Sequence, residues 1–222
     1  MPISETYNMD CLEAMREMPD NAFDLAIVDP PYGIDAANMK MGKGKNQRWT
    51  NKDWDQNTPT NSYFDELFRV SQRQIVFGGN YFELPATGGW LYWNKDRRKE
   101  VSFADGELAW TNFLTVLKEV KVRYDGFIGA DLWRIHPTQK PVALYKWLLK
   151  NYAKPGDKIL DTHLGSQSSR IAAWDLGFDF VGYELDEDYF REGNERFERH
   201  RAQPTLFEAV IVTTQQTSLF TA

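Results

Sequence analysis

The chain has 222 residues, of which 42% are apolar, and this length allows one α/β domain with a well-formed core. One cysteine excludes an internal disulfide and favours a reducing, cytoplasmic setting, while the absence of a run of about 18 apolar residues argues against a membrane span. The net charge of −6 disfavours a large DNA-coating surface. The three histidines are scattered along the sequence and do not form a metal-ligand cluster. The N-terminus does not resemble a signal peptide.

The N-terminal part of the chain predicts a short helix followed by a buried strand. Asp10 is a good helix N-cap, and Glu13 three residues later supports a helix start there. The apolar run 23–28 predicts a strand that is buried on both faces. It stops at the sequence Asp29-Pro30-Pro31-Tyr32, because two prolines cannot continue a central strand.

The middle of the chain is less regular. Residues 33–58 are polar and rich in glycine, and they predict a mobile loop. A helix is expected at about 61–72, with strands at 74–77, 90–93 and 107–111. The segment 95–135 is the hardest to assign.

Regular alternation returns after Pro141. Helices are expected at 142–152, 168–176 and 186–201, and strands at 158–161 and 180–184, each of which ends in an acidic residue. Alternating strands and helices predict a doubly wound α/β domain with a mostly parallel sheet and helices on both faces. We expect one domain over 1–202, with a catalytic half at 1–94, a cofactor half at 136–202 and a tail at 203–222.

The motif 29–32 carries the sharpest chemical signal. The prolines would hold the Pro30 carbonyl and the Asp29 carboxylate so that both acceptors point at one spot, which suits the two donors of an exocyclic NH₂ group. Tyr32 would supply a flat face on which a base can stack. The less specific interpretation is an ordinary strand-to-loop turn with a surface tyrosine.

A second motif, at 161–169, places a tight glycine-containing turn between a strand and a helix start. Such a turn lets the backbone approach a ligand closely. Glu184, at the tip of the next strand, is placed to bind ribose hydroxyls. A plain strand–helix–strand unit is the alternative, and the third motif, His136-Pro137-Thr138-Gln139-Lys140-Pro141, could by itself be a simple helix entry.

Together and in this order, the three motifs resemble the DNA amino-methyltransferase family (N6-adenine and N4-cytosine) in its permuted form, with the catalytic DPPY element first. The resemblance covers roughly residues 5–200 and implies the Rossmann-like fold of S-adenosylmethionine-dependent methyltransferases. It implies methyl transfer from S-adenosyl-L-methionine to the exocyclic amine of a flipped base, and DPPY favours N6 of adenine. The catalytic residues that it implies are Asp29, Pro30, Pro31 and Tyr32.

The same resemblance implies a set of cofactor-binding residues drawn from five parts of the chain. One of them, the element at positions 10–11, resembles a family motif near the cofactor adenine. The set is Asp10, Cys11, Asp29, His136, Thr138, Gln139, Lys140, Asp161, Leu164, Gly165, Ser166, Gln167, Ser168 and Glu184.

The cofactor loop departs from the family pattern DPFxGSGTT in its Pro-Phe pair and in its second glycine. Thr162 and His163 replace Pro and Phe, and Gln167 replaces the second glycine. If that position requires a positive φ, Gln167 carries strain; if it already starts the helix, glutamine is harmless.

The implied partner is double-stranded DNA, and 33–58 and 95–135 are the expected target-recognition segments. Basic residues in these segments are expected to contact phosphates. They are Lys43, Lys45, Arg48, Arg97 and Arg98. Permuted members are often homodimers, and the tail carries two QxxLF-like pieces, at 203–207 and 216–220, that resemble peptides which dock on sliding clamps.

Several other functions stay open at this point. The closest is N4-cytosine methylation, although SPPY is commoner in enzymes of that kind. Methylation of a protein glutamine or an RNA amine is disfavoured by Asp29 and by the motif order. A DNA-binding protein with a decayed cofactor site is supported by Gln167, and a generic nucleotide-binding domain would leave the DPPY element unexplained.

Overall fold

The fold was determined as a computed structural model that describes residues 1–36, 54–97, 104–124 and 134–203. The elements follow in chain order. They are β1 (Ser4–Asn8), α1 (Cys11–Arg16), β2 (Phe23–Val28), α2 (Asn61–Val70), β3 (Ser71–Phe77), the 3₁₀ turn η3 (Gly79–Tyr81), β4 (Trp90–Asn94), β5 (Gly106–Thr111), β6 (Lys118–Lys121), α3 (Val142–Tyr152), β7 (Lys158–Asp161), α4 (Ser168–Leu176), β8 (Asp179–Glu184) and α5 (Glu187–Arg201).

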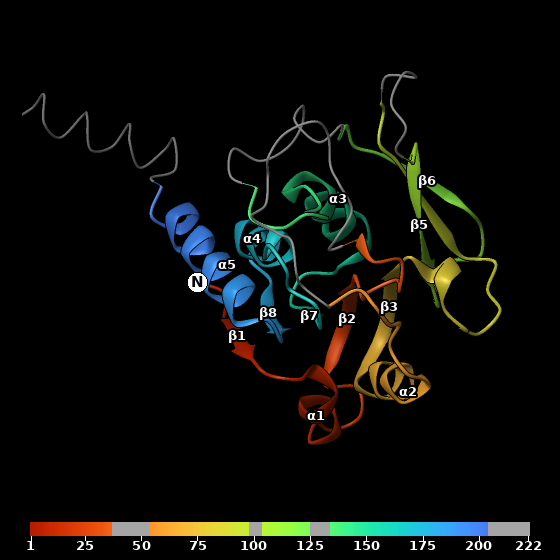
Figure 1. The fold of residues 1–222 in the computed structure, drawn as a ribbon, viewed down its shortest axis with the longest axis horizontal. Helices are drawn as coiled ribbons and strands as arrows, with labels where there is room; N and C mark the ends of the chain where they lie inside the picture. The colour runs from red at the N-terminus through yellow and green to blue at the C-terminus, as the bar shows by residue number, and fades with distance from the viewer. Residues whose placement is uncertain (37–53, 98–103, 125–133, 204–222) are drawn as a thin grey trace, which may run out of the picture.

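One eight-stranded sheet in the order β1-β8-β7-β2-β3-β5-β4-β6 organises the molecule. The strands from β1 to β3 are all parallel to their neighbours, whereas β5 runs antiparallel to both β3 and β4. The predicted doubly wound, mostly parallel α/β fold is confirmed. Strands from both sequence halves lie side by side in this sheet (Figure 1).

Helices cover both faces of the sheet (Figure 1), and alternate residues of the central strands point to opposite faces. Leu25 and Ile27 belong to the core under α3 and α4, whereas Ala26 and Val28 belong to the core under α1 and α2. Because both faces are buried, the strand reads as a continuous apolar run, which is why β2 was predictable from sequence. Helix α5 packs beside α4, where Phe197 meets Trp174 at 5.7 Å between ring centroids.

Most predicted elements are confirmed, and the differences lie at polar ends and edges. Helix α2 stops at Val70, earlier than expected, because Ser71 already starts β3. Strands β1 and β6 were not predicted, because they have the mostly polar sequences SETYN and KEVK and lie at the two edges of the sheet. In the described part of the chain, no helix has the length and apolarity needed to cross a membrane.

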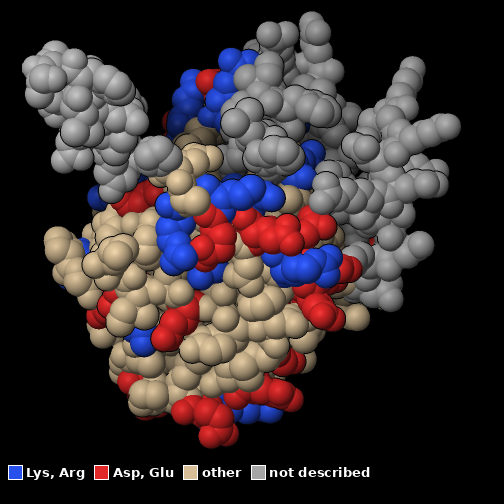
Figure 2. Space-filling view, turned by 90° about the vertical axis from the view of Figure 1, so that its left-hand side faces the viewer, with Lys and Arg blue, Asp and Glu red and all other residues tan. Residues whose placement is uncertain are grey.

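The face that carries α5 has a mixed charge pattern. Figure 2 shows basic and acidic side chains side by side in a band across this face. Two pairs on α5 are formed within the helix, Arg191 with Asp188 at 2.8 Å and Arg201 with Glu198 at 2.7 Å. The charges on this face therefore largely compensate one another locally.

Leu148→Ala tests the core on the α3 face. Leu148 is 1% exposed, so the truncation should lower the free energy of unfolding by about 2–5 kcal/mol through lost burial and a residual cavity. Chemical denaturation measures the change. Leu117→Ala is the matched control, because Leu117 is 62% exposed and its truncation should change stability by less than about 0.5 kcal/mol. Equal effects of the two substitutions would contradict the described core.

Candidate active site

Three acidic side chains meet at the carboxyl edge of the parallel strands. Asp29 follows β2, Asp161 ends β7 and Glu184 ends β8, and these strands are adjacent in the order β2-β7-β8. Residues Ala26 and Leu160 are paired across β2 and β7, so the tips at Asp29 and Asp161 lie close together, as predicted. Burial raises the pKa of Asp161 to about 7, and the charges of Asp29 and Glu184 add to this rise.

The DPPY element is held in one conformation by its own hydrogen bond and by ring stacking. The Tyr32 hydroxyl donates to Asp29 Oδ1 at 2.6 Å. The Tyr32 ring stacks on Tyr81, with centroids 4.9 Å apart and planes 9° from parallel. It also lies directly against Gly78, where an added Cβ would come within 2.2 Å of the ring. Gly78 has φ +65°, so glycine is required there both for conformation and for space.

Asp55, which the sequence analysis did not single out, organises the chain after the DPPY element. Its side chain accepts from the backbone N–H of Tyr32 at 2.6 Å, of Gly33 at 3.0 Å and of Ala36 at 2.7 Å. The residue is 2% exposed. The expected mobile loop 33–58 is thus anchored at both described ends, and no local sequence signal joins an aspartate to donors about twenty residues away.

The third motif lies against both parts of the site. The His136 ring contacts Trp54 and Tyr189 at centroid distances of 5.0 and 4.3 Å, and it lies close to Gly165. Thr138 Oγ1 is 3.1 Å from His136 Nδ1, and the Gln139 side chain accepts from the Ile135 N–H at 3.0 Å. These contacts order the motif itself; cofactor binding by His136, Thr138 and Gln139 stays a prediction.

Lys140 lies nearer to the DPPY element than a cofactor-binding role implies. Its ammonium donates to Asp29 Oδ2 and lies 3.2 Å from Glu107 Oε2. Glu107 Oε1 in turn pairs with Lys95 at 2.6 Å. The chain reverses direction in β5, so Glu107 near the start of that strand reaches the same sheet edge as the ends of β2 and β3.

The loop after β7 is held by hydrogen bonds from its backbone to two of the acidic strand tips. Glu184 Oε2 accepts from the Gly165 N–H at 2.7 Å, and Asp161 Oδ1 accepts from the His163 N–H at 3.0 Å. Arg196 of α5 donates to the Ser166 carbonyl. Burial raises the pKa of Glu184, whose carboxylate also accepts from the Asp186 N–H.

The remaining predicted residues line or support this loop. Leu164 is buried and donates its N–H to the Tyr183 carbonyl at 2.9 Å, and the hydroxyls of Ser166 and Ser168 lie 3.1 Å apart. Asp10 caps α1 by accepting from the Leu12 N–H at 2.7 Å. Cys11 is buried, which raises the pKa of its thiol to about 12, so it is not a thiolate nucleophile at neutral pH.

Gln167 adopts the left-handed conformation, with φ 58°, so this position does require a positive φ. The side chain is fully buried and reaches toward α5. It accepts from Arg170 at 2.9 Å, donates weakly to Asn194 at 3.3 Å, and packs on Gly193, where an added Cβ would meet its Cγ at 2.7 Å. Side-chain anchoring therefore offsets the backbone strain.

The other two departures are also supported by neighbouring side chains. The Thr162 hydroxyl lies 2.6 Å from the Tyr63 hydroxyl of α2 and 2.9 Å from His163 Nδ1. Burial lowers the pKa of His163 to about 4, so the ring is neutral at physiological pH. A neutral ring in contact with Tyr63 at 5.4 Å can fill the space of the family's phenylalanine without adding charge.

The residues expected to contact DNA are only partly described. Lys43, Lys45, Arg48 and Arg98 lie outside the described residues. Arg97 donates to the Ala104 carbonyl at 3.2 Å, and its contact with DNA stays a prediction. Within the described chain, no group of three or more His, Cys, Asp or Glu side chains could hold a metal ion.

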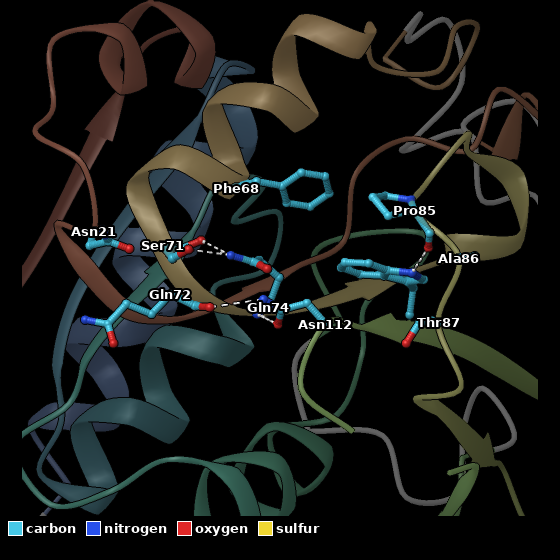
Figure 3. A pocket seen from close by; sticks show the side chains of 10 residues that line it. Asn21, Phe68, Ser71, Gln72, Gln74, Pro85, Ala86, Thr87 and Asn112 are labelled. Carbon is cyan, nitrogen blue, oxygen red and sulfur yellow. Dashed lines mark hydrogen bonds between the residues drawn. The ribbon is translucent and has the colours of Figure 1, made fainter. Parts of the chain in front are cut away.

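A pocket of about 370 Å³ lies away from these residues, near the amino ends of β2 and β3 (Figure 3). Its lining includes the carboxamides of Asn21, Gln72, Gln74 and Asn112. Figure 3 shows Gln74 turned toward Ser71, to which it donates. Parallel α/β sheets bind their ligands at the carboxyl ends of the strands, so this pocket is not the candidate active site.

The fold and the site together define a Rossmann-like α/β protein whose acidic strand tips surround a glycine loop. Residues 89–195 match the family model described as DNA methylase (N6_N4_Mtase). The type II methyltransferase M1.MboII of Moraxella bovis is 21% identical to this chain over an alignment of 264 positions. The alignment covers 87% of this chain and 96% of that protein. This part of the chain is therefore similar to the N6 and N4 DNA methylases.

Solved structures of methyltransferases share the fold. The M1.HpyAVI–SAM complex has a TM-score of 0.57 at 19% identity, covering 86% of this chain and 98% of that chain. The PvuII DNA methyltransferase, described as cytosine-N4-specific, has a TM-score of 0.60 at 16% identity, covering 92% and 89%. The chain thus shares the Rossmann-like fold of these two methyltransferases.

Asp55→Ala should leave the backbone donors of Tyr32, Gly33 and Ala36 without their acceptor. We expect a loss of about 1–3 kcal/mol in the free energy of unfolding, measured by denaturant titration. Asp105→Ala removes an exposed carboxylate and should change stability by less than about 0.5 kcal/mol. An Asp55 variant as stable as this control would refute the anchoring role.

Gly193→Ala should have opposite effects in two backgrounds. With Gln167 present, the new methyl group collides with its side chain, and we expect a loss of about 1–3 kcal/mol. With Gln167→Gly, the collision is absent, so alanine should stabilise the helix by about 0.5–1 kcal/mol. A double-mutant cycle by chemical denaturation measures the coupling. Additive effects would show that Gln167 does not depend on Gly193.

Proposed function

We propose that this protein is a DNA methylase that transfers a methyl group from S-adenosyl-L-methionine to N6 of adenine in double-stranded DNA. The observation that carries the proposal is the position of Asp29. Its carboxylate lies at the tip of β2 beside Tyr32, and β2 is hydrogen-bonded to β7, the strand that leads into the glycine loop. A base amine and a cofactor could therefore meet at one strand edge.

The residues at this edge fit a cationic cofactor with hydroxyl groups. Asp29, Asp161 and Glu184 are carboxylates on neighbouring strands, and burial raises the pKa of each. A nearby positive charge would relieve this cost, and hydroxyl donors suit carboxylate acceptors. Glu184 would hold the ribose hydroxyls, with Gly165 leaving the backbone accessible. When bound, S-adenosyl-L-methionine would supply a sulfonium methyl group: the S–CH₃ bond breaks to leave a neutral thioether as the amine nitrogen gains the methyl group, and the nitrogen releases one proton to solvent.

The DPPY element would prepare the amine for this reaction. Asp29 and the Pro30 carbonyl would accept the two N–H groups, which favours a pyramidal nitrogen with its lone pair free. Tyr32 would stack on the base, which must leave the DNA helix to reach the site. Much of the rate would come from positioning and electrostatics in a partly water-excluded place.

The geometry of Gln167 weighs against the alternative of a decayed cofactor site. Its side chain occupies space between α4 and α5, held by Arg170 and packed on Gly193, so it does not fill the glycine loop. The departure from the family pattern is therefore compatible with cofactor binding. Homodimer formation and clamp docking through the tail stay predictions, and the residues from 204 on lie outside the described chain.

The choice between adenine and cytosine depends on the DPPY resemblance. Cytosine N4 is also an exocyclic NH₂ group and would fit the same two acceptors. The structural similarity to the cytosine-N4-specific PvuII enzyme gives this second candidate a definite basis. Only the product distinguishes the two bases.

The test is methyl transfer from labelled S-adenosyl-L-methionine to unmethylated duplex DNA, followed by digestion to nucleosides. We expect label in N6-methyladenine for the wild type and a loss of at least about 100-fold for Asp29→Ala, because the amine loses its charged acceptor. Label in N4-methylcytosine would keep the mechanism and change the base. Folded wild-type protein that binds no cofactor and labels no nucleoside would overturn the proposal.

A further inference from the structure

Four charged side chains form a continuous chain behind the catalytic motif, in the order Lys95, Glu107, Lys140 and Asp29. Lys95 Nζ is 2.6 Å from Glu107 Oε1, Glu107 Oε2 is 3.2 Å from Lys140 Nζ, and Lys140 donates to Asp29 Oδ2. We refer to these four residues as the Lys140 charge chain. The side chain of Lys140 is 4% exposed, so its charge is almost removed from water.

The Lys140 charge chain fixes the orientation of the Asp29 carboxylate. One oxygen, Oδ2, accepts from Lys140, and the other, Oδ1, accepts from the Tyr32 hydroxyl at 2.6 Å. A carboxylate that is held at both oxygens cannot rotate freely, yet each oxygen keeps a second lone pair for a substrate N–H. The Lys140 ammonium is itself placed over the Phe77 ring, 4.7 Å from its centroid.

Both oxygens of Asp29 can accept hydrogen bonds only when the carboxyl group is ionised. Apart from Lys140 and Tyr32, the surroundings of Asp29 oppose its ionisation. Burial and the charge of Glu107 raise its pKa, whereas Lys140 and the Tyr32 hydroxyl lower it. The titratable groups that face Asp29 come from five elements of the described chain. They are Tyr32 after β2, Lys140 before α3, Glu107 on β5, Asp161 on β7, Tyr63 on α2 and Tyr145 on α3. Lys140 is the cation within this described set.

Glu107 in turn balances the charge of Lys140. Burial alone would raise the pKa of Glu107, but Lys140 and Lys95 lower it to about 2, so Glu107 is anionic at neutral pH. Lys140 therefore divides its attraction between two carboxylates. That division leaves Asp29 able to accept from a substrate amine as well.

We propose that Lys140 is a positioning residue for methyl transfer, which keeps Asp29 ionised and correctly turned, while Glu107 shares the charge of Lys140. The inference rests on the proposed function and gives Lys140 a role toward the base rather than toward the cofactor. It predicts opposite pH shifts for the two partners. Loss of Lys140 should make Asp29 harder to ionise, whereas loss of the Glu107 charge should make it easier.

The experiment compares the pH dependence of kcat for the wild type, Lys140→Met and Glu107→Gln. Lys140→Met should move the acidic limb up by about 1–3 pH units, so activity below that limb falls about 10- to 1,000-fold and recovers as the pH rises. Glu107→Gln should move the limb down. Lys146→Met is the matched control, because Lys146 pairs with Asp175 on the outer side of α3 and should leave the limb in place.

A second readout does not depend on activity. The infrared band of the protonated Asp29 carboxyl, assigned by its absence in Asp29→Asn, gives the titration midpoint of this group in each variant. The midpoint should rise in Lys140→Met and fall in Glu107→Gln. If Lys140→Met does not fold, the double variant with Glu107→Gln removes one charge of each sign, and its midpoint should lie above that of Glu107→Gln alone.

The outcomes separate the two proposals. An active wild type with the same acidic limb and the same infrared midpoint in Lys140→Met would overturn the role of Lys140, even if that variant is slower at every pH. A wild type without methyl transfer would overturn the proposed function instead. In that case, the infrared midpoints alone would still support or refute the control of Asp29 by Lys140.

Discussion

The parallel pairing of β2 with β7 is the constraint on which the site depends. Asp29 and Asp161 are separated by most of the chain, yet the pairing of Ala26 with Leu160 brings their strand tips to one edge. A shift of one residue in this register would turn the apolar side chains of β2 to the wrong faces of the sheet. Because Leu25 and Ile27 fill one core and Ala26 and Val28 the other, packing fixes the register and therefore the meeting of the two motifs.

Bringing several carboxylates to one buried edge carries an electrostatic cost, and the structure offsets it in different ways. Asp55 and Glu184 accept backbone N–H groups, whereas Asp29 and Glu107 share the ammonium of Lys140. Backbone donors cannot be lost without unfolding the local chain, so they suit residues that shape loops. A lysine can redistribute its attraction between two carboxylates, which suits a group that must also accept from a substrate.

The glycine loop after β7 shows how a departure from the DPFxGSGTT pattern can be accommodated. Glutamine at a positive φ is strained, but the burial of Gln167 against Gly193 and its bond from Arg170 keep it there. The consequence is that α5 supports the loop from behind, together with Arg196 and the Ser166 carbonyl. The loop conformation is thus stabilised by contacts with two helices, α4 and α5, and does not depend on a second glycine.

The sequence by itself determined the features that depend on neighbouring residues. Hydrophobic runs and helix periodicity predicted β2, α3 and α4, and the acids that end the parallel strands indicated the reactive edge, because those patterns express local propensity and burial. Tertiary structure alone decided the strands β1 and β6, the anchoring by Asp55, the side on which Gln167 packs and the pairing of Lys140 with Asp29 and Glu107. Polar edge strands and buried polar contacts acquire their partners only when segments distant in the sequence come together. No local sequence pattern therefore predicts them.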